Sequence, residues 1–430
     1  MSETNEQSNN RITTPKKLFD HVKKFNFPRL AGSEGEKKAV DLSIQTFEEL
    51  GYSESEIQTE EFEFSDFYST TLIKLIMTLS LTFTLILIFL LYIYPWVTIV
   101  LIGIMAIVVF LITRGLRTPE KKNFWGEYFG NILEATNVFV KIPASEINES
   151  EAGNIVISAH LDSKSQSIKT LWRVIIYRIW LYSGVLLGGV FIWFLLYQIG
   201  VIQLESRVFM IGKLEIVIIN LAIWPLTILI AISNIVLMFL NTHNKSPGAL
   251  DNASGMAIVF ELSSYFRDKG LKNFNLWFCQ FSAEELGTMG SRIFVNNHED
   301  QFEKGKVYQI NFDMVSAAKS RKNQVEYLKS YGVYPRKKIA PELSGYLNKA
   351  ASKNNIKIYG FHLSTGAHTD CVPFHLKGYH AIDLSTRAAA LYSHSKEDTL
   401  DKVDPQVLEQ ACILTKDALF MLDQNFNNET

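Results

Sequence analysis

The chain has 430 residues, of which 47% are apolar and 20% are charged, and its formal net charge is −2. This length suits one large domain with added segments, and the charge gives no basic surface of the kind that binds nucleic acid. The three cysteines, Cys279, Cys371 and Cys412, are too few and too scattered for a disulfide framework or a thiolate metal site. They favour a reducing compartment.

The N-terminal part reads as a polar tail followed by soluble secondary structure. Residues 1–14 are expected to be disordered and show no cleaved signal peptide. Residues 15–26 have the pattern of an amphipathic helix, and a second helix is predicted from about 35 to 50. Residues 56–66 alternate between apolar and polar side chains, which predicts a half-buried strand.

Four long apolar runs follow, at residues 72–93, 96–113, 174–199 and 215–240. Each is long enough to cross about 30 Å of hydrocarbon as a helix. Buried core helices are the alternative, but helices of soluble proteins seldom run so far without a polar face. We therefore predict two transmembrane hairpins, at 69–114 and 171–243, inserted between soluble segments at 15–68, 115–170 and 244–425.

Basic residues near the ends of the spans predict the topology. The ends that join the soluble segments carry most of them: Lys74, Arg114, Arg117, Lys121, Lys122, Arg173, Arg178 and Lys245. The first hairpin loop carries none, and the second carries Arg207 and Lys213. We expect a multi-pass membrane protein whose soluble domain and both termini are cytoplasmic.

Strands and helices alternate through the rest of the soluble sequence. Strands are predicted at 131–142, 154–158, 274–281, 307–315, 356–362 and 379–385, and helices at 252–266, 287–297, 341–354 and 405–423. This alternation predicts an α/β domain with a largely parallel sheet. Functional loops in such sheets lie at the carboxyl ends of the strands.

Ionisable residues recur at these strand ends. His160 and Asp162 end an apolar strand and point the same way, and Asp251 with Asn252 opens a predicted helix. The remaining candidates, each weak when taken alone, are Glu284, Glu285, Asp313 and His394. Together these residues supply two histidines and three carboxylates as ligands, with further carboxylates for proton transfer. Nitrogen and oxygen ligands of this mix suit Zn²⁺, and a bridging carboxylate suits a two-metal site.

The order His-x-Asp, Asp-Asn-x-x-Gly, Glu-Glu, Asp, His resembles the M28 family of di-zinc peptidases, as does Arg29-Leu-Ala-Gly-Ser with the helix that ends near Gly51. The resemblance implies a three-layer α/β/α sandwich with a mixed, mostly parallel sheet. It implies two zinc ions, with Co²⁺ or Mn²⁺ as alternatives. The implied function is a membrane-anchored metallopeptidase, an aminopeptidase by preference, acting on a peptide or amino-acid amide.

The resemblance also implies roles for single residues. His160 and Asp313 would bind one zinc ion, Glu285 and His394 the other, and Asp251 would bridge the two. Glu284 would be the general base, and Asp162 would orient His160.

Two further residues are candidates for substrate binding. Tyr392 could stabilise the oxyanion, although it lies two residues before His394 rather than next to it. His368 could contact the substrate, because Cys371 stands where the family has a histidine after Asp370.

Three other functions stay open at this stage. A glutaminyl cyclase-like acyltransferase would use a similar site with one zinc ion, and a silent receptor or scaffold would lose ligands, whereas the full set is present. A transporter has little support, since the apolar runs hold almost no ionisable residues.

The second hairpin begins close after Asp162 and ends close before Asp251, so the site is expected within about 35 Å of the bilayer. The hairpins either deliver substrate or only anchor the enzyme.

Overall fold

The computed structural model describes residues 12–115, 118–121, 124–202, 208–211, 214–217, 220–332, 335–363 and 369–426. Contacts divide the chain into two compact units. The sheet unit comprises Met1–Ser65, Ile132–Thr170 and Thr242–Thr430, and the helical unit comprises Asp66–Asn131 and Leu171–Asn241. Each unit is thus assembled from separated stretches of sequence.

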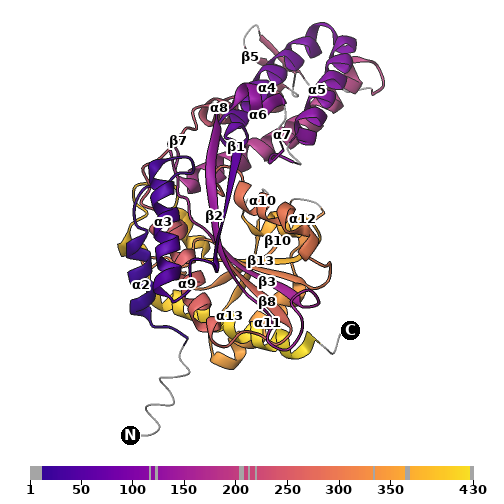
Figure 1. Ribbon diagram of the computed structural model, residues 1–430. Coiled ribbons are helices and arrows are strands. Elements are labelled where there is room, and N and C mark those ends of the chain that lie inside the picture. Colours follow the sequence, from indigo (N-terminus) through magenta and orange to yellow (C-terminus); the bar gives the residue numbers. More distant parts are fainter. Residues whose placement is uncertain are drawn as a thin grey trace. The chain divides into compact units, whose positions relative to one another are not determined.

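A mixed sheet forms the centre of the sheet unit (Figure 1). Its strands are β1 (Ile57–Ser65), β2 (Ile132–Ile142), β3 (Gly153–His160), β8 (Phe274–Phe281), β9 (Val307–Phe312), β10 (Glu326–Tyr331), β11 (Lys337–Lys338), β12 (Tyr359–Leu363) and β13 (His380–Ser385). They lie in the order β1-β2-β8-β3-β9-β13-β10-β11, with β12 beside β10. The central strands β8, β3, β9 and β13 are parallel, whereas β1, β2, β10 and β11 make antiparallel pairs toward the edges.

Helices cover both faces of this sheet (Figure 1). One layer contains α2 (Pro15–Lys24), α3 (Glu34–Glu49), α9 (Ser254–Arg267), α11 (Pro341–Asn354) and α13 (Pro405–Asn425). The other contains α10 (Met289–Asn297) and α12 (Cys371–Leu376), which contact each other. The predicted three-layer α/β/α sandwich is confirmed, with its parallel strands concentrated at the centre.

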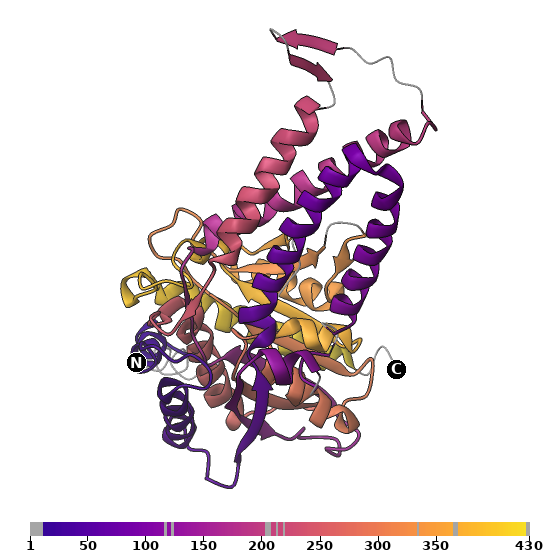
Figure 2. The ribbon, with the colours of Figure 1, turned by 90° about the horizontal axis from the view of Figure 1, so that it is seen from above.

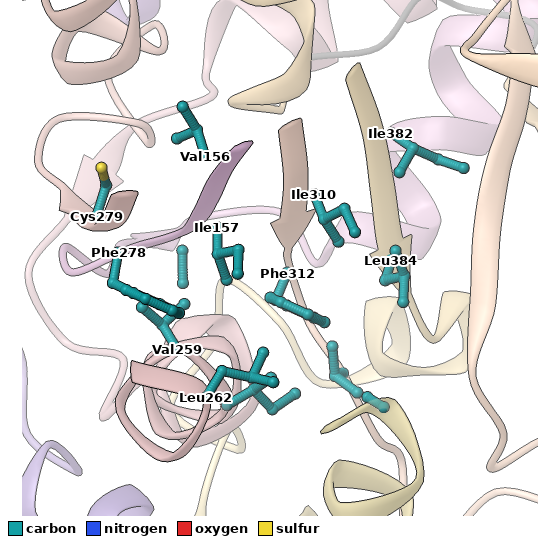
Figure 3. Packing of buried hydrophobic residues seen from close by; sticks show 14 of the residues in the cluster. Val156, Ile157, Val259, Leu262, Phe278, Cys279, Ile310, Phe312, Ile382 and Leu384 are labelled. Carbon is teal, nitrogen blue, oxygen red and sulfur yellow. The ribbon is translucent and has the colours of Figure 1, made fainter. Parts of the chain in front are cut away.

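The core lies between the parallel strands and α9. Ile157 pairs with Phe278 and Ile310, and Phe312 pairs with Leu384, so these apolar side chains share one face of the sheet. Figure 3 shows Val259 and Leu262 of α9 facing them. Each of these residues is fully buried, and full burial of such a side chain stabilises the fold by about 1.5–3 kcal/mol. The core therefore fixes the strand ends from which the polar residues project.

The helical unit holds four helices that are long and apolar enough to cross a membrane. They are α4 (Phe67–Ile93), α5 (Pro95–Gly115), α7 (Thr170–Gln198) and α8 (Asn220–Met238). Helix α4 contacts both α5 and α8 (Figure 2), and a short helix, α6 (Phe124–Phe129), packs against α4. The ends of α7 and α8 that return to the sheet unit are joined by β4 (Ser165–Gln166) and β7 (Thr242–His243), which pair antiparallel.

Several predicted boundaries are wrong, and three of them have a clear local reason. The apolar run at 215–240 does not start as a helix: residues 214–217 form β6, which pairs with β5 (Val208–Ile211), because β-branched residues favour a hairpin there. The strand predicted at 307–315 ends at Phe312, since Met314 takes a left-handed φ of 55°. The helix predicted from 252 begins at Ser254.

A buried carboxylate, Glu36 of α3, ties the helix layer to the loop that follows β8. Its Oε1 accepts hydrogen bonds from the Thr136 amide (3.1 Å) and the Ser282 hydroxyl (2.8 Å). Burial raises the pKa of Glu36 to about 7, against the effect of these hydrogen bonds. Folding therefore favours the protonated form of this side chain.

We predict that Glu36→Gln changes how stability depends on pH. The folded pKa exceeds the ordinary carboxyl value, so the folded chain binds more protons than the unfolded chain between about pH 4.5 and 7, and stability falls as pH rises through that window. Glutamine keeps the accepting oxygen without the charge. The melting temperature of the wild type should therefore fall relative to Glu36→Gln from pH 5 to pH 8, by the equivalent of roughly 1–3 kcal/mol. Intrinsic fluorescence during heating measures this.

The control is Glu34→Gln, which makes the same charge change at an exposed position of the same helix. Its melting temperature should follow that of the wild type at every pH. Parallel pH profiles for the wild type and Glu36→Gln would contradict the prediction.

Candidate metal centre

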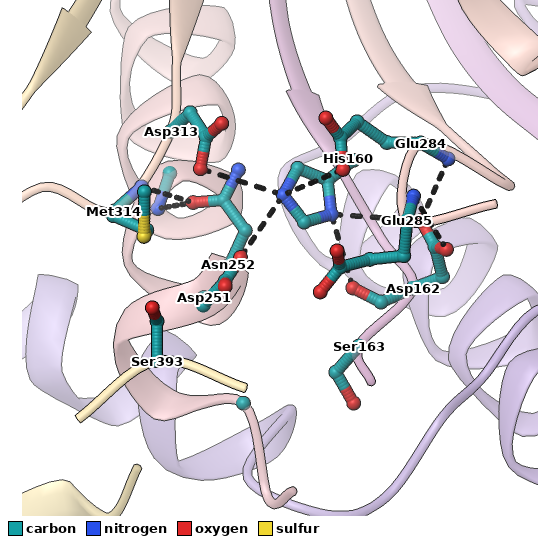
Figure 4. A network of polar contacts seen from close by, with 12 residues as sticks. His160, Asp162, Ser163, Asp251, Asn252, Glu284, Glu285, Asp313, Met314 and Ser393 are labelled. Carbon is teal, nitrogen blue, oxygen red and sulfur yellow. Dashed lines mark hydrogen bonds and ion pairs between the residues drawn. The ribbon is translucent and has the colours of Figure 1, made fainter. Parts of the chain in front are cut away.

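Ionisable side chains from separate loops meet at the carboxyl edge of the parallel strands (Figure 4). This follows from the topology, because β3, β8 and β9 run in the same direction and end at the same edge. The side chains are His160 at the end of β3, Glu284 and Glu285 after β8, Asp313 after β9, Asp251 before α9, and His394 beyond β13. All are buried except His394, which is 12% exposed at its side chain.

These residues form two groups that share Asp251. In the first group, His160 Nε2 lies 3.2 Å from Asp251 Oδ1 and 3.6 Å from Asp313 Oδ1. In the second, His394 Nε2 lies 3.1 Å from both Asp251 Oδ2 and Glu285 Oε2. Each oxygen of Asp251 therefore faces a different histidine, which is the arrangement of a bridging carboxylate.

The donor atoms fit two zinc ions. Ligand atoms around a tetrahedral zinc ion lie about 3–3.5 Å apart, close to the separations within each group. Buried polar atoms normally have hydrogen-bond partners. Among the described residues, His160 Nε2, Asp251 Oδ2 and Asp313 Oδ1 are buried and make no hydrogen bond. Cations at these positions would satisfy all three atoms.

Asp162 holds two parts of the site together. Its carboxylate accepts hydrogen bonds from the backbone amides of Glu284 (3.1 Å) and Glu285 (3.2 Å). Its backbone carbonyl lies 3.0 Å from His160 Nδ1, nearer than its carboxylate oxygen at 3.5 Å. The orientation of His160 thus comes mainly from the main chain of Asp162, and the carboxylate positions the glutamate loop.

Asn252 and Gly255 of the Asp-Asn-x-x-Gly motif have structural roles next to Asp251. Its amide donates to the Phe312 carbonyl (2.7 Å), and its carbonyl oxygen accepts from the Gly255 amide (3.0 Å). A Cβ at Gly255 would lie 2.4 Å from Asn252 Oδ1 and 2.5 Å from the Phe312 carbonyl oxygen. The motif therefore joins the start of α9 to the end of β9, beside Asp313.

Arg29 joins the chain on both sides of the second apolar insertion. Its fully buried guanidinium donates to the carbonyl oxygens of Leu161 (2.5 Å), Pro247 (2.8 Å) and Gly248 (2.9 Å). Burial lowers the pKa of Arg29 to about 10, so it stays charged at neutral pH. Gly248 is required here: its φ is 65°, and a Cβ would lie 2.7 Å from Arg29 Nη1.

The two adjacent glutamates have opposite electrostatic environments. Burial raises the pKa of Glu284 well above its ordinary value. Burial acts in the same direction on Glu285, but His394 and Lys164 outweigh it and hold the pKa of Glu285 down to about 2. Lys164 Nζ lies 2.8 Å from Glu285 Oε2. The predicted roles of Glu284 as general base and Glu285 as metal ligand thus fall on two side chains whose pKa values are shifted in opposite directions.

The two predicted substrate contacts have different outcomes. Tyr392 is half-buried and packs against the core, with the Lys402 ammonium 5.3 Å from its ring centroid, and its role in binding substrate stays a prediction. His368 lies outside the described residues.

Several residues that shape the site were not singled out from the sequence. The Asp398 carboxylate accepts hydrogen bonds from the backbone amides of Leu250 (2.6 Å) and Asp251 (3.1 Å) and so holds the main chain of Asp251 in place. Lys164 and Thr170, which lead into the second insertion, contact Glu285 and His394. Asp398 and Lys164 lie within a few residues of predicted ligands, so closeness in sequence was the only available signal.

We predict that Asp251→Asn removes zinc from both groups, whereas His394→Ala removes it from one. Loss of a residue that orients a ligand weakens metal binding about 10–100-fold, and loss of the shared ligand itself should exceed this at both positions. Metal content after gel filtration in a zinc-buffered solution measures the effect. The control is Asp300→Asn, the same change at an exposed position, which should keep the wild-type content. Two zinc ions on Asp251→Asn would rule out a bridging role.

The chain is similar in sequence to one protein family and to a curated aminopeptidase. Residues 237–416 match the family model Peptidase family M28. The chain is 27% identical to the aminopeptidase YwaD of Bacillus subtilis over 189 residues, which cover 41% of this chain and 38% of that protein. The match thus spans less than half of the curated relative.

Solved structures show the same fold. An aminopeptidase from Aneurinibacillus sp. strain AM-1 superposes with a TM-score of 0.55 at 14% identity, covering 96% of this chain and 94% of its own. The zinc aminopeptidase BSAP from Bacillus subtilis gives 0.53 at 13% identity, with 95% of both chains covered. A glutaminyl cyclase from an Acidobacteriales bacterium gives 0.51 at 15% identity, covering 96% and 95%.

The fold is therefore common to peptidases and cyclases, and the sequence matches are to a peptidase family model and to an aminopeptidase. The ligand-bearing residues from Asp251 to His394 all lie inside the matched range. The predicted resemblance to peptidase family M28 is confirmed by this match over residues 237–416.

Proposed function

We propose that the protein is a membrane-anchored zinc peptidase, by preference an aminopeptidase, that uses two metal ions. The observation that carries the proposal is the pair of three-ligand groups joined by Asp251, with a protonatable glutamate beside them. The family match and the curated aminopeptidase support the same reaction class.

The residues divide the chemical work between them. When bound, two zinc ions lower the pKa of water toward neutrality and polarise the scissile carbonyl. Glu284 lies 3.9 Å from His160 Nε2 and is not needed to complete either group, so its carboxylate is available for protons. It accepts one from the attacking water and donates it to the leaving amine as the carbon–nitrogen bond breaks. Asp162 keeps Glu284 in place through the backbone hydrogen bond.

We predict that Glu284→Gln abolishes turnover without loss of metal. Glutamine has nearly the same shape but cannot accept the proton, so kcat should fall by at least about 10²–10⁴-fold. A panel of aminoacyl-4-nitroanilides with detergent-purified protein measures the rate, and metal analysis of both proteins measures the zinc. Glu303→Gln, the same change at an exposed position, should keep full activity.

The same assay separates the alternatives. Cleavage of free but not N-blocked anilides identifies an aminopeptidase, whereas ring closure of N-terminal glutaminyl peptides identifies a cyclase. Two zinc ions with no turnover of any amide would indicate a silent scaffold. Full activity in Glu284→Gln would refute the assigned base.

The helical unit supports membrane anchoring, since each of its four long helices meets the length and hydropathy of a span. The excess of basic residues at the ends that join the sheet unit supports a cytoplasmic metal centre. We propose that the four helices cross the bilayer as two hairpins whose loops lie on the opposite side.

Single introduced cysteines test this topology, because Cys279, Cys371 and Cys412 are buried and should not react. In intact cells, a membrane-impermeant maleimide should label Val201→Cys, an exposed position between α7 and α8. It should label Lys304→Cys, an exposed position in the sheet unit, only after permeabilisation. The reverse pattern would place the metal centre outside the cytoplasm.

A further inference from the structure

The segment that leads into the second apolar insertion contacts the second metal group. We call residues 163–170 the entry segment. The Lys164 ammonium pairs with Glu285 Oε2 at 2.8 Å and donates to the Glu285 carbonyl at 2.8 Å. The backbone N–H of Gln166 donates a hydrogen bond to the backbone carbonyl of His394 at 2.9 Å. Thr170, the first residue of α7, lies with its hydroxyl 3.3 Å from His394 Nδ1.

The backbone of His394 takes an uncommon conformation. Its φ is 55°, in the left-handed region that residues other than glycine adopt at an energetic cost. Such a conformation persists only where surrounding contacts hold it, and the bond from Gln166 is one of these contacts. Lys169 adds an ion pair to Glu397, in the same loop as His394 (2.7 Å).

The Thr170 hydroxyl is placed to orient the His394 ring. It lies 3.3 Å from the Ser393 carbonyl, to which it can donate, and this leaves its lone pairs available to His394 Nδ1. The other ring nitrogen, Nε2, faces Asp251 and Glu285. A histidine that binds metal through Nε2 carries its proton on Nδ1, and an acceptor there fixes the tautomer and the ring plane.

The two histidines are therefore oriented from different parts of the chain. His160 Nδ1 faces a carbonyl two residues away, inside its own strand-end turn. His394 Nδ1 faces a hydroxyl at the first residue of an apolar helix, which is distant in sequence. Any displacement of the start of α7 changes the second contact and leaves the first intact.

We infer that Thr170 is a positioning residue for His394, through which the entry segment sets the affinity of the second metal position. The inference rests on the proposed two-zinc function. It assigns to the entry segment, which leads into the second hairpin, a role in assembling the metal centre.

The test is a zinc titration of the metal-free, full-length protein in detergent by calorimetry, which resolves two dissociation constants. Thr170→Val keeps the shape and removes the hydroxyl. It should weaken the second zinc about 10–100-fold and leave the first unchanged. Thr170→Ser, which keeps a hydroxyl, should restore binding close to that of the wild type.

The matched control is Thr415→Val, the same change at a buried hydroxyl in α13, which should leave both constants unchanged. Wild-type constants for both zinc ions in Thr170→Val would overturn the inference, as would equal weakening of both ions. Fewer than two zinc ions on the wild type would overturn the proposed function itself, and the inference with it. A selective effect on the second ion, restored by serine, would establish the positioning role.

Discussion

Electrostatic repulsion among buried carboxylates is the constraint on which the rest of this structure depends. Asp251, Glu284, Glu285 and Asp313 lie close together with little access to water, where like charges repel strongly and desolvation disfavours ionisation. Two histidines and the Lys164 ammonium counter this repulsion through ion pairs with the carboxylates. The neighbouring carboxylate of Asp162 accepts hydrogen bonds from two backbone amides. Cations at the remaining unpaired atoms would lower this repulsion further. A fold that could not hold these groups rigidly would separate them, so the dense apolar core below the strand ends is a condition for the site.

This edge of the sheet is held by many contacts although the chain leaves the sheet unit between two of the candidate ligands. His160 precedes the second insertion and Asp251 follows it. The two ends are joined by the β4–β7 pair, by the bond from Ser163 to the Ser246 carbonyl (3.2 Å), and by Arg29. Arg29 is effective because its planar guanidinium directs several donors at once, and its bonds here go to main-chain carbonyls. The insertion can therefore be long without loosening the ligands, since loop-closure cost grows slowly with length.

Much of this architecture was predictable because local patterns were strong. Residues 274–281 and 341–354 coincide with β8 and α11, and the five candidate ligands, singled out at strand ends and by the family resemblance, lie together in the fold. Other features depend on tertiary context. β10 was missed because Glu326–Tyr331 mixes charged and apolar residues, and its pairing with β13 and β12 decides its conformation.

The left-handed residues in the ligand loops show the same limit. Ala283, Met314 and His394 carry no sequence signal for a positive φ, and the surrounding hydrogen bonds hold them. The contacts of Thr170 and Lys164 likewise appear only once distant segments meet. Sequence patterns thus singled out the candidate ligands, whereas the contacts that orient them required the fold.

The separation of His160 from Asp251 by α7 and α8 also has a consequence for biosynthesis. A ribosome delivers His160 first, then the second pair of apolar helices, and only then Asp251, Glu285, Asp313 and His394. In a chain whose apolar helices enter the bilayer as they emerge, no complete ligand set exists until that hairpin has left the translocation channel. In the proposed two-metal site, four of the five ligands are therefore synthesised only after this hairpin, and neither metal position can be complete before it.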